Sequence, residues 1–306
     1  MHIAVLIPCY NEESTIAGVV GDFHTALPSA VIYVYDNNSA DRTREAAERA
    51  GAIVRREPLQ GKGNVVCRMF ADIDADIYVL VDGDGTYDAT SAVQMIGRMQ
   101  AETLDMVNGA RVAKNPSAYP PGHALGNVIL TGLVRRIFGK RFGDMLSGYK
   151  VFSRRYVKSF PALASGFEIE TSLTIHALEL HMPVDEIKTP YGERPAGSAS
   201  KLRTFHDGFR ILWMILRLVE EERPLQMFWT LALVFVAASL ALAYPVFLTF
   251  LETGLVPRLP TAVLSASLMV LAFVSIASGL ILEMVTLGRR EAKRLRYLAQ
   301  PAPPPS

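Results

Sequence analysis

The sequence has few cysteines and almost no net charge. Its 306 residues include two cysteines, Cys9 and Cys67, and 31 basic side chains against 30 acidic ones. Two cysteines give no disulfide framework and their spacing matches no metal-binding motif, so we expect reduced thiols. A net charge of +1 provides no general attraction to nucleic acid, and we predict no nucleic-acid partner.

The first residues lack the features of a secretion signal. The apolar run at residues 3–8 is short, and it has neither a basic flank nor a small-residue cleavage site. We therefore expect the N-terminus to stay in the cytosol.

Long uncharged runs do occur, but only near the C-terminus, at residues 225–251 and 259–282. Each is long enough to span a hydrocarbon core of about 30 Å. Two buried core helices are the alternative, although soluble helices of that length usually carry a polar stripe. We predict a hairpin of two transmembrane helices, 225–251 and 259–288.

Basic residues lie before the first helix of this hairpin and after the second. Three arginines precede it, and five basic residues follow it: Arg210, Arg217 and Arg223, then Arg289, Arg290, Lys293, Arg294 and Arg296. Since cytosolic flanks carry the excess of Lys and Arg, we expect both termini in the cytosol and a multi-pass protein of the plasma (inner) membrane. Residues 289–306 are predicted to be a basic segment with a disordered, proline-rich end.

The segment before the hairpin, residues 205–222, has an amphipathic pattern. Phe209, Leu212, Trp213 and Leu216 recur on one side at helical spacing. This pattern predicts an interfacial helix with its apolar side in the lipid. A helix packed on the preceding domain is the alternative.

Residues 1–204 alternate between strand and helix patterns. We expect strands at 2–8, 30–35, 77–81 and 105–110, and helices at 13–27, 41–50, 64–73 and 89–101. This alternation predicts an α/β domain with a mainly parallel sheet. In such sheets a ligand binds at the carboxyl ends of the strands.

Acidic residues stand at two of those strand ends. Asp36 closes the second strand, and Asp82 and Asp84 follow the third with one glycine between them. Carboxylates on a flexible turn suit Mg²⁺ or Mn²⁺. A calcium loop is excluded because positions 86, 87 and 93 are Thr, Tyr and Val; a solvated turn and a phosphoacceptor pocket remain as alternatives.

Basic and hydroxyl groups follow in segments where phosphates would need them. They are Lys62 in a glycine-flanked turn, Arg111 after a strand, Ser147 and Lys150 in "SGYK", and Arg194, Ser198, Ser200 and Lys201 in a loop at 189–204. Each could be a solvated surface charge, but together with the acidic strand ends they indicate a metal–diphosphate site.

Six short motifs, in order, resemble those of the family 2 glycosyltransferases of the GT-A (Rossmann-like) fold. They are "IPCYNEE" at 7–13, "DNNSADRT" at 36–43, "GKGN" at 61–64, "DGD" at 82–84, "SGYK" at 147–150 and "FEIE" at 167–170. Within the family the chain looks like the dolichyl- or polyprenyl-phosphate sugar synthases. The resemblance covers residues 2 to about 220.

The resemblance implies roles for individual residues. Donor nucleotide binding would fall to Pro8, Tyr10, Glu12, Asp36, Lys62 and Asp82, and metal binding to Asp82 and Asp84. Acceptor phosphate binding would fall to Arg111, Ser147, Lys150, Arg194, Ser200 and Lys201, with Asp84, Arg111 and Lys201 as the catalytic set. Glu168 and Glu170 would organise the site or face solvent. Members often carry arginine in place of Lys150, which puts a bidentate phosphate contact there in doubt.

The implied reaction moves a sugar from a UDP- or GDP-linked donor to polyprenyl phosphate, with inversion, in the synthesis of a cell-envelope glycan. Three alternatives stay open: a hydroxyl acceptor, an inactive membrane-anchored binding protein, and a nucleotidyltransferase. The Q-x-x-R-W element of processive synthases is missing, and "PCYNEES" is not a glycine-rich basic loop. A homo-oligomer is also left open.

Overall fold

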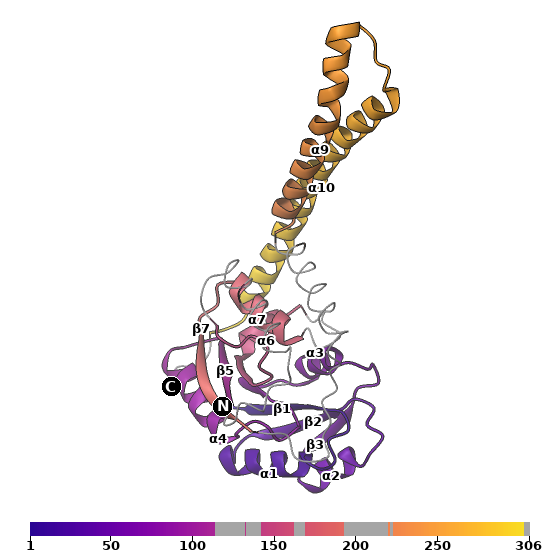
Figure 1. Ribbon diagram of the computed structural model, residues 1–306. Coiled ribbons are helices and arrows are strands. Elements are labelled where there is room, and N and C mark those ends of the chain that lie inside the picture. Colours follow the sequence, from indigo (N-terminus) through magenta and orange to yellow (C-terminus); the bar gives the residue numbers. More distant parts are fainter. Residues whose placement is uncertain (114–131, 133–141, 162–168, 193–219, 221–222, 303–306) are drawn as a thin grey trace. The chain divides into compact units, whose positions relative to one another are not determined.

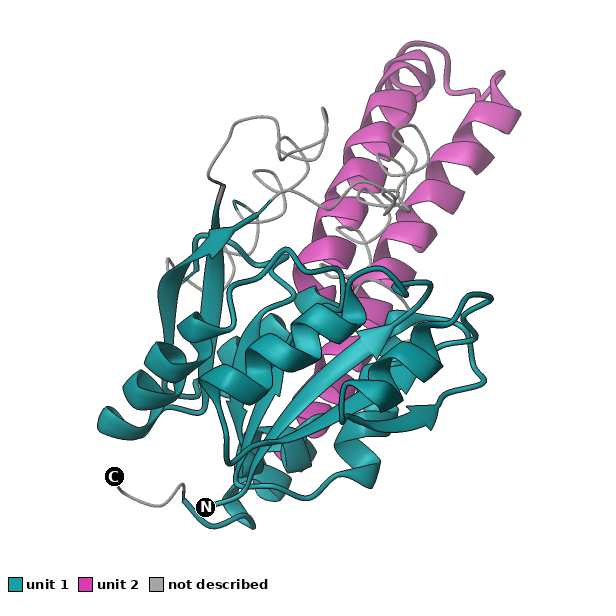
Figure 2. Ribbon diagram, turned by 90° about the horizontal axis from the view of Figure 1, so that it is seen from below, with its two compact units in different colours: residues 1–211, 292–306 teal, residues 212–291 magenta. Residues whose placement is uncertain are grey.

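The structure is a computed structural model that describes residues 1–113, 132, 142–161, 169–192, 220 and 223–302. The chain forms two compact units, shown in different colours in Figure 2. Unit 1 comprises residues 1–211 and 292–306, and unit 2 comprises residues 212–291.

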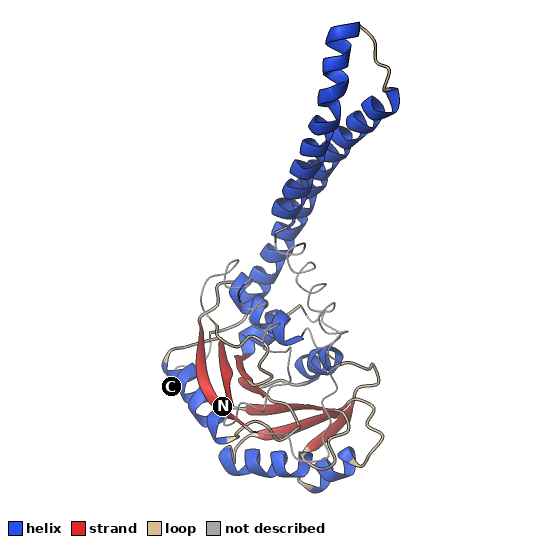
Figure 3. Ribbon diagram, viewed as in Figure 1, coloured by secondary structure: helices blue, strands red, loops and turns tan. Residues whose placement is uncertain are grey.

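Unit 1 is built on a seven-stranded sheet with the order β3-β2-β1-β4-β6-β5-β7 (Figure 3). The strands are β1 (Ile3–Cys9), β2 (Val31–Asp36), β3 (Ile53–Arg56), β4 (Ile77–Leu80), β5 (Met106–Ala113), β6 (Lys150–Ser153) and β7 (Val184–Tyr191). β6 runs antiparallel to both of its neighbours, and the other pairs are parallel. The carboxyl ends of six strands therefore meet at one edge of the sheet, together with the first residue of β6.

Helices cover both faces of this sheet. They are α1 (Ile16–Ala26), α2 (Thr43–Arg49), α3 (Lys62–Asp72), α4 (Thr90–Ala101), α6 (Arg154–Ser159) and α7 (Ile169–Glu179). In Figure 1, α1, α2 and α4 lie on one side of the sheet, and α3, α6 and α7 on the other.

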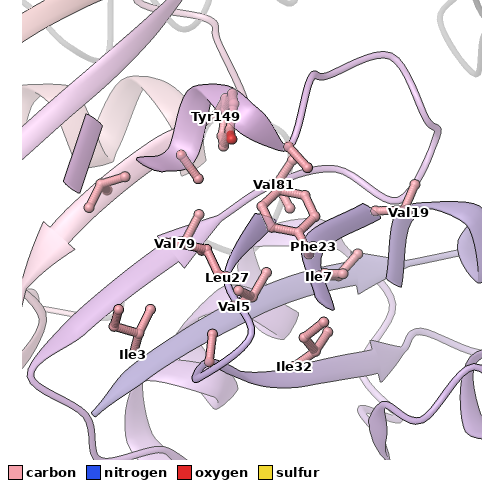
Figure 4. Packing of buried hydrophobic residues seen from close by; sticks show 14 of the residues in the cluster. Ile3, Val5, Ile7, Val19, Phe23, Leu27, Ile32, Val79, Val81 and Tyr149 are labelled. Carbon is pink, nitrogen blue, oxygen red and sulfur yellow. The ribbon is translucent and has the colours of Figure 1, made fainter. Parts of the chain in front are cut away.

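Alternation along the strands sends apolar side chains into a separate core on each face. Val5, Ile7 and Val79 join Phe23 of α1 in one core (Figure 4). On the opposite face Phe70 of α3 makes edge-on ring contacts with Tyr78, Phe152 and Phe160. Burial on both faces explains why the central strands read as continuous apolar runs.

Unit 2 contains α9 (Pro224–Thr253) and most of α10 (Leu259–Leu298). Both helices are long and apolar enough to cross a membrane, and only 11% and 17% of their most apolar windows are buried. The two helices pack through small residues: the Ser239 and Ser265 hydroxyls each donate to the other's backbone carbonyl, at 2.8 and 2.9 Å. A Cβ at Gly279 would lie 2.9 Å from the Phe228 Cβ. Such close backbone approach is typical of helices packed in lipid.

The sequence patterns located four of the six parallel strands, β1, β2, β4 and β5, and four helices to within a few residues. β3, β6 and β7 were not predicted, because they are short or polar at one face. α10 continues through the basic segment to Leu298, beyond the predicted end of the span at 288. The predicted interfacial helix at 205–222 lies almost wholly outside the described residues.

Candidate active site

Acidic side chains flank β1 at the carboxyl edge of the sheet. β1 pairs in parallel with β2, which ends at Asp36, and with β4, which leads into Asp82 and Asp84. Asp36 is buried, and its carboxylate accepts a hydrogen bond from the Ser39 backbone N–H at 3.2 Å. The structure thus brings both predicted acidic strand ends to one edge.

The "DGD" turn is tightly packed on two sides. Asp84 is buried, and its Oδ1 accepts hydrogen bonds from the Thr86 hydroxyl at 2.6 Å and the Thr86 N–H at 3.2 Å. A Cβ at Gly83 would lie 2.7 Å from the Cys9 sulfur, and a Cβ at Gly148 would overlap the Asp82 carboxylate. Glycine at these positions lets the backbone approach closely and fixes where the two carboxylates lie.

Lys62 bridges two carboxylates beside this turn. Its ammonium is 2.5 Å from Asp82 Oδ1 and 2.5 Å from Glu170 Oε1. Burial lowers the pKa of Lys62, but the charges of Asp82 and Glu170 outweigh it, so the pKa lies above its ordinary value and the ammonium is retained. The Lys62 side chain is 13% exposed, that of Glu170 9% and that of Asp82 28%. Asp82 is therefore the member of the trio that solvent reaches most easily.

The loop that leads into Lys62 and α3 is held by Asn37, which follows β2. The Asn37 amide nitrogen donates to the Glu57 and Leu59 carbonyls at 2.9 and 2.8 Å. Its amide oxygen accepts from the Gly61 N–H at 2.7 Å, and Gly61 adopts a φ of 135° immediately before α3. The second residue of the "DNNSADRT" motif thus positions the start of α3.

A second lysine, Lys150, lies in the interior at the start of β6. Its ammonium donates to Asn108 Oδ1 at 2.6 Å and to the Thr174 hydroxyl at 3.2 Å. The Thr174 hydroxyl in turn donates to the Glu170 carbonyl at 3.0 Å. Burial lowers the pKa of Lys150 to about 8. α7 therefore contacts both lysines: Glu170 pairs with Lys62, and Thr174, one turn further along the helix, accepts a hydrogen bond from Lys150.

Arg111 of β5 is held by Asp144. The guanidinium makes two hydrogen bonds to the Asp144 carboxylate, at 2.7 and 2.9 Å, and lies 5.6 Å from the centre of the Tyr191 ring. Burial raises the pKa of Asp144, but the hydrogen bonds and the positive charge of Arg111 together outweigh it and hold that pKa below its ordinary value. Glu186 of β7 accepts from the Gly143 and Asp144 N–H groups and from the Asn108 amide, which fixes the turn that carries Asp144.

The predicted site residues fall into three groups. Asp82, Lys62 and Glu170 are in direct contact, and Asp84, Asp36, Pro8 and Arg111 lie at or near the same edge of the sheet. Ser147 and Lys150 are fully buried, with the Ser147 hydroxyl donating to the Gly109 carbonyl at 2.5 Å, so their acceptor role stays a prediction. Tyr10 and Glu12 follow β1, and the Glu12 N–H donates to the Thr43 hydroxyl at 2.8 Å.

Five of the residues considered for the site in the sequence analysis lie outside the described residues. They are Glu168, Arg194, Ser198, Ser200 and Lys201. Their roles also stay predictions.

Sequence reasoning missed several residues that shape the site. Asn108, Asp144 and Glu186 hold Arg111 and Lys150, and the Tyr87 hydroxyl accepts from the Gly148 N–H at 2.9 Å. A signal existed for Asp144, which stands three residues before the "SGYK" motif. Asn108 and Glu186 carried none, because they meet only through the pairing of β5 with β7.

Comparison with known proteins identifies the group to which this arrangement belongs. Residues 4–160 match the family described as Glycosyl transferase family 2. The chain belongs to glycosyltransferase family 2. Because the matched region contains Asp36, Lys62, Asp82, Asp84, Arg111 and Lys150, the edge of the sheet described above is the candidate active site of a glycosyltransferase.

Two archaeal relatives and one bacterial relative are similar over different lengths. Glycosyltransferase AglJ of Haloferax volcanii is 35% identical over 243 residues, 79% of this chain and 80% of the relative. A dolichyl-phosphate hexose transferase of the same organism is 27% identical over 221 residues, 72% of this chain and 95% of the relative. Protein RfbJ of Shigella flexneri is 57% identical over 123 residues, 40% of this chain and 95% of the relative.

Solved structures confirm the fold. Glucosyl-3-phosphoglycerate synthase from Mycobacterium tuberculosis, in complex with Mn²⁺, UDP and phosphoglyceric acid, superposes with a TM-score of 0.58. The alignment covers 72% of this glycosyltransferase and 78% of that chain, at 21% identity. The similarity establishes the GT-A type of α/β domain predicted from the sequence.

Proposed function

We propose that this glycosyltransferase transfers a sugar from a nucleoside-diphosphate sugar to polyprenyl phosphate at the cytosolic face of a membrane. The observation that carries the proposal is the pair of long, exposed apolar helices on the C-terminal side of the family domain. A soluble acceptor would not require them, whereas a lipid phosphate is presented at a bilayer. The similarity to a dolichyl-phosphate hexose transferase supports the same acceptor class.

The residues present fit a divalent metal between enzyme and donor. Within the described ranges no group of three His, Cys, Asp or Glu side chains could hold a metal alone. Asp82 and Asp84 would supply two oxygen ligands, and the donor diphosphate would supply others, as Mg²⁺ and Mn²⁺ commonly require. Asp82 already carries a cation, the Lys62 ammonium, which shows that positive charge is stabilised at this carboxylate.

The bound metal would neutralise the leaving diphosphate as a Lewis acid. The chain's own residues would orient the reactants. Asp36, at the carboxyl end of β2, would contact the donor nucleoside, and Arg111, held by two hydrogen bonds to Asp144, would provide a fixed guanidinium for an acceptor phosphate. A new bond forms between a phosphate oxygen of the acceptor and the anomeric carbon. The bond from that carbon to the donor diphosphate breaks, and the nucleoside diphosphate leaves with the electron pair, with inversion.

A phosphate acceptor makes a general base unnecessary. The second pKa of a phosphate monoester is about 6, so the attacking oxygen is already largely ionised at neutral pH. A sugar hydroxyl would need a base to remove its proton. Arg194, Ser200 and Lys201 are proposed to close over the acceptor phosphate.

The test uses the full-length protein in detergent with undecaprenyl phosphate, Mn²⁺ or Mg²⁺ and a panel of UDP- and GDP-sugars. We expect release of nucleoside diphosphate and formation of a lipid-phosphate sugar from one donor, both lost with EDTA. Nucleotide release without a lipid product would overturn the acceptor assignment. Lys201→Ala is expected to weaken acceptor use while leaving donor binding unchanged.

The proposed topology places both termini in the cytosol and the short link between α9 and α10 on the other side. A cysteine introduced at Leu255 in that link should react with a membrane-impermeant maleimide added to intact cells. Cys67, in unit 1, provides an internal control that should react only after lysis. Labelling in the reverse order would overturn the orientation.

A further inference from the structure

In this structure the Asp82 carboxylate already forms an ion pair with the Lys62 ammonium. The Lys62 ammonium touches an oxygen of Asp82 and an oxygen of Glu170 at equal distances of 2.5 Å. Glu170 is buried on α7. A buried glutamate facing the active-site lysine requires an explanation, since burying a carboxylate is costly unless it is paired.

We propose that Lys62 is a resident counter-cation that moves from Asp82 to the donor diphosphate when donor and metal bind, and that Glu170 is the positioning residue that holds it in reach. This inference rests on the proposed function, because it assumes that a divalent metal binds Asp82 and Asp84. It assigns Lys62 two successive partners and gives Glu170 a definite role.

Charge balance supports the transfer. Two carboxylates compete for one ammonium, so Lys62 can leave Asp82 without losing ionic contact altogether. Asp82 is the more exposed of the two partners, with 28% of its side chain accessible against 9% for Glu170, and it is therefore the one that an incoming cation can reach. A dication at Asp82 would repel the ammonium, and the donor diphosphate would provide a new anionic partner beside it.

The local framework is suited to a small movement of this kind. Lys62 is the first residue of α3 and follows Gly61, whose backbone is fixed by Asn37. Glu170 is fixed in turn by α7, where the Thr174 hydroxyl donates to its carbonyl. Only the flexible lysine side chain has to move, while both backbone anchors remain in place.

The test measures Mn²⁺ binding by electron paramagnetic resonance to the full-length protein in detergent, without donor or acceptor. Lys62→Met removes the competing ammonium and is expected to raise the affinity for Mn²⁺ by about tenfold. Glu170→Gln leaves Asp82 as the carboxylate that pairs with Lys62, and this variant is expected to have an affinity for Mn²⁺ about tenfold lower than the wild type.

The double variant Lys62→Met/Glu170→Gln separates displacement from net charge. It has the same net charge as the wild type but no ammonium on Asp82, so the proposal expects tighter Mn²⁺ binding than in the wild type. Equal affinity in the two proteins would mean that only overall charge matters, and would overturn the proposal.

A second readout is the affinity for UDP and GDP at saturating Mn²⁺, measured by calorimetry. Lys62→Met should weaken binding of the nucleotide that the wild type prefers, although it strengthens binding of the metal alone. If Lys62 had only a structural role, Lys62→Met would weaken the binding of both Mn²⁺ and the nucleotide. Lys293→Met is the matched control, because Lys293 also pairs with a buried glutamate, Glu179 at 2.6 Å, but lies outside the site. It should change neither affinity.

Failure of this inference is distinguishable from failure of the proposed function. If the wild type binds no Mn²⁺ with or without UDP and GDP, the metal assignment itself is wrong and both fall. If the wild type binds Mn²⁺, Asp82→Asn abolishes the binding and Lys62→Met leaves it unchanged, only the role assigned to Lys62 and Glu170 is overturned.

Discussion

The two edges of the catalytic sheet each carry an aspartate paired with a basic residue, but they differ in how completely the carboxylate is satisfied. At the carboxyl edge Asp82 is 28% exposed and pairs with Lys62, which it shares with Glu170. At the opposite edge Asp105, immediately before β5, is fully buried. It accepts hydrogen bonds from Ser153, from two nitrogens of Arg155 and from the Tyr297 hydroxyl, all within 2.8 Å.

The two ion pairs differ in whether the carboxylate is fully hydrogen-bonded or partly exposed. Asp105 has its own bidentate arginine, whose guanidinium also stacks over the Tyr297 ring at 4.9 Å, so no oxygen remains for a ligand. Asp82, in contrast, pairs with a flexible lysine that is also in contact with a second carboxylate, that of Glu170. The first arrangement joins β5, β6 and the last turns of α10 within unit 1, while the second leaves a carboxylate that would exchange its cation in the proposed mechanism.

The largest effect is expected at the carboxyl edge. Asp84→Ala should reduce turnover by at least about a thousandfold, because a lost metal contact removes several kcal/mol of charge stabilisation in the transition state. The free energy of unfolding should fall by only about 1–3 kcal/mol, because the buried Thr86 hydroxyl and N–H lose their acceptor. Initial rates with donor and lipid acceptor, beside chemical unfolding curves, check both expectations. Full activity of the variant would refute the metal assignment.

The opposite edge should give the reverse result. Asp105→Ala leaves the partly buried Arg155 guanidinium without its partner, which is expected to cost about 3 kcal/mol of unfolding free energy. Protein that remains folded should retain its turnover per molecule. The matched variant Asp82→Ala should lose activity at a much smaller cost in stability. If Asp82→Ala and Asp105→Ala destabilised the protein equally, the contrast between the edges would be wrong.

A pH effect of intermediate size is expected from His176 of α7. Burial lowers the pKa of His176 to about 3, with a smaller contribution from the positive charge of Lys293. In the unfolded chain the pKa of this residue has its ordinary value near 6.5. Below pH 6.5 the unfolded state therefore binds a proton that the folded state does not, and stability falls as the pH decreases. The loss is about 2 kcal/mol at pH 5.

His176→Gln should remove this pH dependence while keeping a hydrogen-bonding partner for Ser159, which lies 3.1 Å from the His176 Nε2. Unfolding curves at pH 5 and pH 7 measure the difference. A wild type equally stable at both values would contradict the assignment of acid sensitivity to this residue.

The smallest effect is expected in unit 2. Ser239→Ala removes one hydroxyl from the reciprocal Ser239–Ser265 pair, and hydrogen bonds between membrane helices are worth about 0.6–2 kcal/mol. Thermal unfolding of the protein in detergent should show the loss, with turnover unchanged below the transition. Ser267→Ala is the control, because the Ser267 hydroxyl donates within its own helix, to the Val263 carbonyl. It should be close to neutral.

The local features of this protein could be predicted from its sequence. Short apolar runs indicated four of the parallel strands, and uncharged stretches indicated the two long helices, because both patterns reflect burial or contact with lipid over consecutive residues. Asp36, Asp82 and Asp84 could be placed at one edge, since parallel strands present their carboxyl ends together. Family membership also followed from short motifs, each contained within a few residues.

The pairing of charges was decided only by the tertiary structure. Lys62 and Glu170 are 108 residues apart in the sequence, and Asn108 and Glu186 are 78 apart. Their contacts depend on α7 packing beside α3 and on β7 pairing with β5, which no local pattern encodes. The same holds for Lys150, whose motif indicated a phosphate ligand but whose ammonium is buried between Asn108 and Thr174. A sequence fixes which charges a chain carries, whereas the cost of burying each charge, and hence its partner, depends on how distant segments pack.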